Sequence, residues 1–202
     1  MKDLAKIRSD VVGSLLRPAH LKEARLAFDE GKISPDEMRR IEDQAIRQAV
    51  LLQETVGLDV VTDGEFRRLN FQDSFGESVA GFDAGRTDIR FYERRVEGSK
   101  PLQRWEIPDQ GEAKGTPVAQ RRPVVERLRL ARNIPLEEYR FVSGVAQKPA
   151  KVTLIGPDRI SQRFDYRNST SIYPTVDDFV ADVVKIEREI VRRLAAAGPS
   201  PW

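Results

Sequence analysis

The amino-acid sequence predicts an α/β fold, the N-terminal half of a TIM (β/α)8 barrel with about four parallel strands, their helices and a β-hairpin excursion. Short apolar segments alternate with amphipathic segments along the 202 residues, and this alternation is typical of a parallel sheet. A closed barrel needs eight such units and about 250 residues, whereas only four units can be counted here. A small open α/β sheet is the alternative that the same pattern allows.

The sequence starts with an expected strand and a short expected helix. Residues 10–14 form a brief apolar run that Gly13 interrupts, so a buried strand followed by a loop is expected. Apolar residues then recur at helical spacing over 21–28, and Gly31 stands where helices commonly stop. The pattern therefore predicts a helix over residues 21–28.

The strongest local signal is the segment 34–37, Ser-Pro-Asp-Glu. It combines an N-cap hydroxyl, a proline at the first helical position and a glutamate three residues after the cap. Apolar residues follow at steps of three and four until Gly57, which occupies the position of a left-handed C-cap. A helix of about six turns is predicted. Residues 58–65 come directly after it as a second expected strand, which completes half of a βα repeat.

The stretch 66–120 is rich in glycine, proline and charged residues. It also holds short β-like pieces at 89–92 and 102–107. A structureless loop of that length is unusual in a compact domain. We therefore expect a hairpin excursion over one face of the sheet.

Regular alternation returns after this excursion. Residues 123–128 and 150–155 are expected to be strands, and residues 135–145 are expected to form the helix between them. Thr175, with an aspartate three positions later, is a further cap, and the helix that it starts is expected to end near Gly198. The two added strands bring the predicted parallel set to four.

The composition excludes several classes of protein. The sequence has no cysteine, so it cannot be a disulfide scaffold or supply a cysteine-ligated zinc site by itself. Its formal net charge is +2 and its charges interleave, which argues against a nucleic-acid partner. Neither a bilayer-spanning apolar run nor a signal-peptide core can be found. We therefore expect no membrane association and a cytoplasmic location.

Two of the expected strands end in residues that can carry chemistry. Gly13 and Ser14 end the first strand, where glycine permits close backbone approach and the serine hydroxyl can donate and accept hydrogen bonds. Asp63 and Glu65 flank Gly64 at the end of the second strand, and two carboxylates there suit an ammonium group or a cation. Each of these sequences is also common in ordinary turns. Their position at strand ends, where α/β proteins bind ligands, favours a site.

Three segments carry a family resemblance. They are VVGSLLRP at 11–18, GLDVVTDGEFRR at 57–68 and KVTLIGP at 151–157. In this order and spacing they resemble the cobalamin-independent methionine synthase family, the 5-methyltetrahydropteroyltriglutamate–homocysteine methyltransferases. The similarity is greater to the short, single-barrel relatives of that family, and it extends to about Gly198.

The resemblance implies a (β/α)8 catalytic domain in which zinc helps move a methyl group from a methyltetrahydrofolate-type donor to the thiol of homocysteine, the expected small-molecule partner. The residues implied to contact the amino-acid moiety of homocysteine are Val12, Gly13, Ser14 and Glu65. The family's zinc ligands, a histidine, two cysteines and a glutamate, come from later strands that this sequence lacks. His20 is expected to be a solvated residue at the start of a helix, so no catalytic residue and no metal ligand is assigned.

The last residues, 199–202, read Pro-Ser-Pro-Trp, and they cannot pair in a central strand because each proline lacks an N–H group. We therefore expect a partial catalytic domain over residues 1–198 followed by an aberrant tail. Such a truncated N-terminal half is expected to be inactive alone. The alternatives are a non-catalytic fragment that binds a small amino acid and a module that self-associates through open barrel edges.

Overall fold

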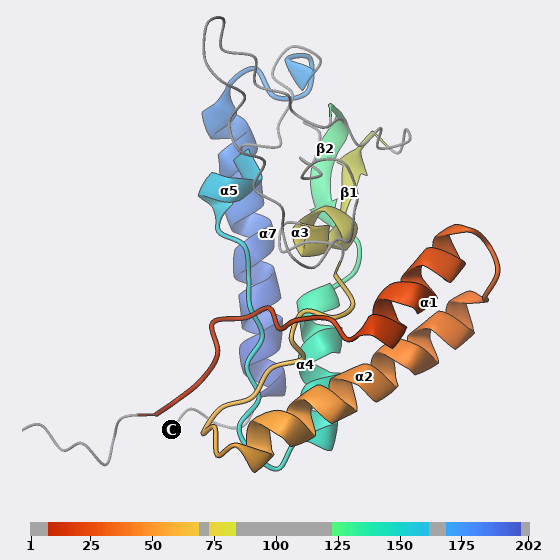
Figure 1. Cartoon of the computed structure of the whole chain (residues 1–202). Helices are drawn as coiled ribbons and strands as arrows, with labels where there is room; N and C mark the ends of the chain where they lie inside the picture. Colours follow the sequence, from red (N-terminus) through yellow and green to blue (C-terminus); the bar gives the residue numbers. More distant parts are fainter. Residues whose placement is uncertain (1–7, 69–72, 84–122, 162–168, 199–202) are drawn as a thin grey trace, which may run out of the picture.

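The computed structural model describes residues 8–68, 73–83, 123–161 and 169–198 (Figure 1). In chain order the elements are α1 (Ala19–Asp29), α2 (Pro35–Thr55), α3 (Asp73–Ser78), β1 (Val79–Phe82), β2 (Val124–Leu130), α4 (Ile134–Val145), α5 (Pro157–Ser161) and α7 (Val176–Ala197). The mixture of helices and strands confirms the α/β class that the sequence predicts. Within the described ranges, no helix is both long enough and apolar enough to cross a bilayer.

The four longer helices lie where the sequence places them. The Ser34 side chain accepts a hydrogen bond from the Glu37 backbone N–H and so caps the start of α2. Gly57 follows the end of α2 with φ of 85°, the left-handed conformation in which glycine is favoured. Asn133, which the sequence analysis did not single out, caps α4 through its side-chain oxygen.

Helix α7 has the most complete cap in the described part of the chain. The Thr175 side chain accepts from the Asp178 backbone N–H, and the Asp178 carboxylate accepts from the Thr175 backbone N–H. This reciprocal pair confirms the predicted cap and satisfies two N–H groups that the helix itself leaves unpaired.

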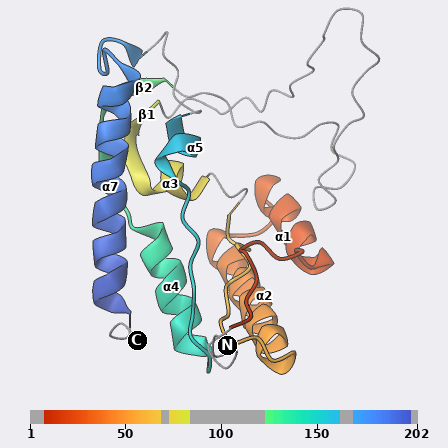
Figure 2. The ribbon, with the colours of Figure 1, turned by 90° about the vertical axis from the view of Figure 1, so that its left-hand side faces the viewer.

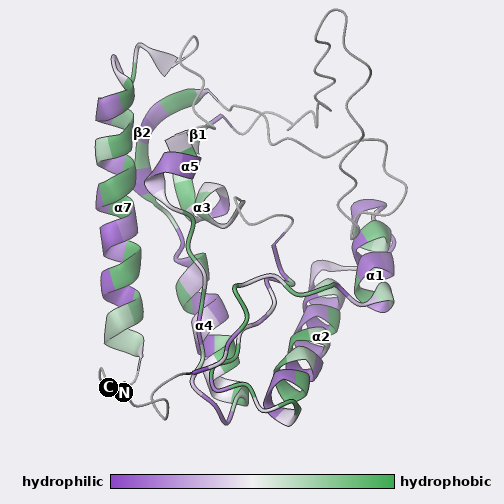
Figure 3. Cartoon of the chain, turned by 60° about the vertical axis from the view of Figure 1, so that its left-hand side comes forward, coloured by the Kyte–Doolittle hydropathy of each residue, from purple (hydrophilic) through white to green (hydrophobic). Residues whose placement is uncertain are grey.

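The helices pack in sequence around two apolar clusters. Helix α2 contacts both α1 and α4, and α4 in turn contacts α7 (Figures 1 and 2). The β1–β2 pair and α5 lie against the first turns of α7, whereas α4 lies along its later turns (Figure 2). One cluster joins α7 to β1, β2 and α5, and the other joins α1, α2 and α4 (Figure 3). The site described below lies along the second cluster.

The strand expected at 123–128 forms, as β2, but its pairing differs from the expectation. It pairs antiparallel with β1, with Val79 opposite Leu130 and Phe82 opposite Val124. Charged side chains occupy much of the outer face of β2 and remain exposed, with the burial pattern of a strand that has one solvated face. The expectation of a parallel strand here is therefore wrong. Strand β1 lies within the 66–120 stretch, and the β-like pieces at 89–92 and 102–107 lie outside the described residues.

The three other expected strands, 10–14, 58–65 and 150–155, are extended segments rather than regular strands. Asp59 N–H donates to Ser9 C=O at 3.0 Å, and Leu15 N–H donates to Gly64 C=O at 3.1 Å, so the first two segments run parallel. Val61 forms an isolated parallel bridge with Ala150. The parallel direction agrees with the prediction, but the described residues form only one sheet, which has two strands.

Glycine and proline residues in these segments explain why no continuous ladder forms. Gly64 adopts φ of 68°, which is incompatible with a strand. Pro149, immediately before the third segment, cannot donate a ladder hydrogen bond. The half barrel itself therefore stays a prediction. The same is true of the 1–198 domain boundary, since residues 199–202 lie outside the described part of the chain.

Burial of Glu187 on α7 makes the stability of the fold depend on pH. Burial raises the pKa of this carboxyl from about 4.5 to about 7, so the folded chain binds more protons than the unfolded chain between these values. The unfolding free energy must then fall as pH rises from 4.5 to 7. Because the side chain is only half-buried, the expected fall is on the order of 1 kcal/mol.

We predict that Glu187→Gln removes this fall when urea denaturation is measured at several pH values. Glu189→Gln, two residues away at a position that pairs with Arg193, is the matched control and should keep it. An unchanged pH dependence in Glu187→Gln would exclude this carboxyl as the cause.

Candidate functional site

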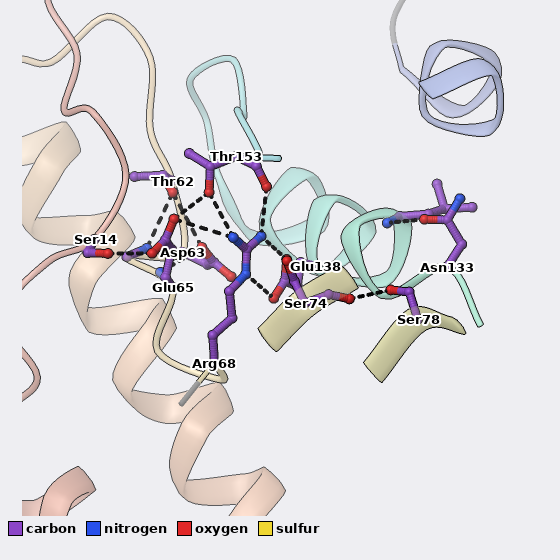
Figure 4. A network of polar contacts seen from close by, with 12 residues as sticks. Ser14, Thr62, Asp63, Glu65, Arg68, Ser74, Ser78, Asn133, Glu138 and Thr153 are labelled. Atoms are coloured by element: carbon purple, nitrogen blue, oxygen red, sulfur yellow. Dashed lines mark hydrogen bonds and ion pairs between the residues drawn. The ribbon is translucent and has the colours of Figure 1, made fainter. Parts of the chain in front are cut away.

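The structure brings three of the four implied site residues, Gly13, Ser14 and Glu65, close together. The Ser14 hydroxyl donates to Glu65 Oε2 across the first two extended segments (Figure 4). Gly13 lies so close that a Cβ there would be 2.9 Å from Glu65 Oε1 and 3.0 Å from Thr153 Cγ2. Val12 is next to them in the chain, but its side chain is 94% exposed. The structure therefore leaves Val12 open to solvent beside the Ser14–Glu65 contact.

A tight turn over residues 62–65 places Glu65 at this position. Asp63 Oδ1 accepts hydrogen bonds from the Glu65 backbone N–H at 2.9 Å and from Thr62 Oγ1 at 3.3 Å. Glu65 itself adopts φ of 58°, a left-handed conformation that is uncommon for a residue with a side chain. Such strained backbone persists only where the surroundings hold it, and it is frequent at functional sites.

Arg17 is one of the residues that hold this turn. Its Nη2 donates to Glu65 C=O at 3.1 Å and to Arg68 C=O at 2.6 Å. These bonds fix the direction in which the chain leaves Glu65. The arginine of the SLLRP sequence therefore supports the turn of the DGE sequence, 48 residues away.

Three residues that the sequence analysis did not assign complete the network. Thr153 Oγ1 donates to Glu65 Oε1, and Arg68 Nη1 donates to the same oxygen at 3.3 Å. Arg68 also forms a forked pair with Glu138 of α4, with N···O distances of 3.0 and 2.5 Å (Figure 4). Arg68 and Thr153 lie in the segments that carry the family resemblance, and this position could have marked them as candidate site residues. Glu138 lies four residues before the buried Val142, so helical spacing places both residues on the inner face of α4. This spacing is the feature of the sequence that could have pointed to Glu138.

The network contains more buried negative charge than positive charge. Asp63, Glu65 and Glu138 are each at most 4% exposed, and Arg68 is the buried cation among them. Burial alone would lower the pKa of Arg68, but the hydrogen bond and the charge of Glu138 outweigh burial, so its pKa is raised. Burial raises the pKa of Glu138, an effect that the Arg68 hydrogen bond only partly offsets. Asp63 Oδ2 is buried without a hydrogen-bond partner among the described residues. The site is therefore suited to a cationic group of a ligand.

The described residues do not fit a zinc site. Over residues 8–68, 73–83, 123–161 and 169–198, no three histidine, cysteine, aspartate or glutamate side chains converge as metal ligands. His20 lies exposed in the first turn of α1, as expected. No step of a reaction is therefore assigned to a metal held by these residues.

Comparison with known proteins extends this description. Residues 8–101 match the family described as cobalamin-independent synthase, catalytic domain. A methionine synthase of Sulfurisphaera tokodaii is 28% identical over 199 residues, covering 98% of this chain and 51% of that protein. The uncharacterized protein YxjG of Bacillus subtilis is 43% identical over 76 residues, covering 38% of this chain and 20% of that protein.

A solved structure supports the same fold. The putative vitamin-B12 independent methionine synthase of Listeria monocytogenes superposes with a TM-score of 0.68 at 24% identity, covering 95% of this chain and 49% of that chain. The parallel extended segments, with a polar network where they end, fit the α/β class of this fold. The chain is thus similar to the cobalamin-independent methionine synthase family, most specifically over residues 8–101. It spans about half the length of relatives that match it throughout.

The close approach of Gly13 to Glu65 and Thr153 can be tested by adding a methyl group. Gly13→Ala should lower the unfolding free energy by about 1–3 kcal/mol, because the new Cβ forces its neighbours apart. Gly144→Ala on α4 is the matched control, since a Cβ there meets nothing within 4 Å. That control should raise stability by about 0.5–1 kcal/mol through helix propensity. Equal effects of the two substitutions in urea denaturation would contradict the packing described at Gly13.

Proposed function

We propose that this chain supplies the homocysteine-binding part of a methyltransferase that moves a methyl group from a methyltetrahydrofolate-type donor to the homocysteine thiol in methionine biosynthesis. What supports the proposal is the contact between Ser14 and Glu65, which joins two family motifs at the ends of adjacent parallel segments. Similarity to the family over residues 8–101 supports the reaction type. A cytoplasmic location is part of the same proposal.

The proposed binding mode follows from the charges of the site. The ligand carboxylate would accept hydrogen bonds from backbone N–H groups of the 12–14 segment and from the exposed Ser14 hydroxyl. The ligand ammonium group would bind the Glu65 carboxylate, in a region where buried carboxylates outnumber guanidinium groups. Ser14 would then exchange its bond to Glu65 for a bond to the ligand. Binding therefore replaces an internal contact with two charge-assisted ones.

Zinc, where family members hold it, favours the thiolate form of homocysteine, which is the nucleophile. We propose that the zinc-ligating residues lie outside this sequence. The chain alone would accordingly bind the amino acid without transferring a methyl group.

Glu65→Gln tests this assignment. Replacing the carboxylate removes a charge-assisted hydrogen bond to the ammonium group, so homocysteine binding should weaken by about 1–3 kcal/mol. Isothermal titration calorimetry of the wild-type chain and the variant measures the difference. Glu126→Gln is the matched control, because Glu126 lies exposed on β2. Its carboxylate is 3.9 Å from the Arg129 guanidinium, at the outer limit of an ion pair. Unchanged affinity in Glu65→Gln, or no binding by the wild-type chain, would contradict the proposal.

A second candidate function is self-association, and exposed apolar side chains favour it. Leu16 is 77% exposed and Leu154 is 41% exposed. They lie at the ends of the first and third extended segments, which flank the 58–65 segment on either side. Open sheet edges beside apolar side chains are templates for pairing with another chain.

Sedimentation equilibrium should therefore show concentration-dependent dimers or larger species of the wild-type chain. Leu16→Ser should shift this equilibrium toward monomer. Leu26→Ser on α1, where the side chain is 61% exposed, should not. A wild-type chain that stays monomeric at all concentrations would rule out self-association.

A further inference from the structure

Arg68 makes more contacts in the polar network than the proposed function uses. Its guanidinium is 3% exposed and donates hydrogen bonds to three different parts of the chain. Nη1 donates to Thr153 Oγ1 at 2.9 Å and to Glu65 Oε1 at 3.3 Å, and Nη2 donates to Thr153 C=O at 2.9 Å. Nε and Nη2 hold the two carboxylate oxygens of Glu138. One side chain therefore joins the 62–65 turn, the 150–155 segment and α4.

The forked pair with Glu138 fixes the plane of the guanidinium. Two parallel N–H···O bonds define the orientation of both groups, whereas a single bond would leave the arginine free to rotate. Because α4 is a packed helix, Glu138 is a rigid anchor for this plane. The remaining N–H groups of Arg68 then point to fixed positions, one of which is Glu65 Oε1.

Glu65 needs such support, because its backbone conformation is unfavourable. Its φ of 58° costs free energy that neighbouring groups must offset. The groups that face it are Ser14 on Oε2, Thr153 and Arg68 on Oε1, Arg17 on its carbonyl and Asp63 on its N–H. Among the described residues, Arg68 is the cation that hydrogen-bonds the carboxylate itself.

We propose that Arg68 is a positioning residue, which holds the Glu65 carboxylate in the orientation that receives the ammonium group of an amino-acid ligand. This inference rests on the proposed function. Arg68 acts through Glu65 and does not touch the ligand, while Glu138 anchors Arg68. Lysine cannot replace it, because one ammonium group cannot reach Glu138, Thr153 and Glu65 with the fixed fork of a guanidinium.

A double-mutant cycle separates positioning from general structural support. If Arg68 acts through Glu65, its replacement weakens homocysteine binding only while the Glu65 carboxylate is present. If Arg68 merely stabilises the fold, its replacement weakens binding by the same factor in both backgrounds. The cycle consists of the wild-type chain, Arg68→Lys, Glu65→Gln and the double variant. Homocysteine affinity is measured by calorimetry, and urea denaturation checks that each variant is folded.

We expect Arg68→Lys to weaken homocysteine binding about tenfold in the wild-type chain and by less than about twofold in the Glu65→Gln chain. Arg67→Lys is the matched control, because Arg67 pairs with Asp43 and lies over the Phe141 ring at 4.4 Å. It should leave the affinity unchanged. Equal losses in both Glu65 backgrounds, or wild-type affinity in Arg68→Lys, would overturn the inference.

If Arg68→Lys does not fold, Glu138→Gln replaces it in the same cycle. Glutamine keeps one acceptor for Arg68 but removes the forked pair, so the same non-additive loss is expected. An additive loss, or no loss, would overturn the inference. A wild-type chain that binds no homocysteine would contradict the proposed function itself. A wild-type chain that binds homocysteine, but in which the losses from the Arg68 and Glu65 substitutions add, would overturn only the inference about Arg68.

Discussion

The buried ion pair between Arg68 and Glu138 is the interaction on which the rest of the site depends. Removing two charged groups from water is costly, and only good geometry with further hydrogen bonds offsets that cost. Here the guanidinium has both, since it is forked to Glu138 and also bonded to Glu65 and Thr153. Loss of Arg68 would leave the buried carboxylates of Glu138 and Glu65 without this cation. The pair therefore couples the position of α4 to the position of the 62–65 turn.

The backbone of the site follows from that coupling. Glycine at position 13 lets the first segment approach Glu65 to a distance that a side chain would forbid. Gly64 and Glu65 turn the chain through left-handed conformations, and Arg17 holds the carbonyls that follow. These local features interrupt regular strand pairing, and they are also what presents a serine hydroxyl and a carboxylate to each other. Irregular backbone and polar function thus have a common origin in the sequence.

Local signals predicted the helices well, because caps and apolar spacing are written within a few residues. The Ser34 and Thr175 caps and the turn at Gly57 are examples. Pairing direction is not local, so the apolar start of β2 was assigned to the parallel set, although its charged residues fit an antiparallel strand with one solvated face. Two motifs single out Ser14 and Glu65 as candidate site residues, but the direct contact between them is known only from the structure. The Arg68–Glu138 pair could not be predicted, because it joins residues 70 positions apart and only one of them lies in a motif.

The most direct test of a ligand site formed by the extended segments is a homocysteine titration of the ¹⁵N-labelled chain followed by NMR. The site described here predicts saturable shifts of the backbone amide signals of Gly13, Ser14, Gly64 and Glu65. Signals from the β1–β2 pair and the last turns of α7 should not shift, because these elements are not part of the apolar cluster of α1, α2 and α4 beside the site. Shifts confined to those distant elements, or no shifts at saturating homocysteine, would contradict the existence of a homocysteine site at Ser14 and Glu65.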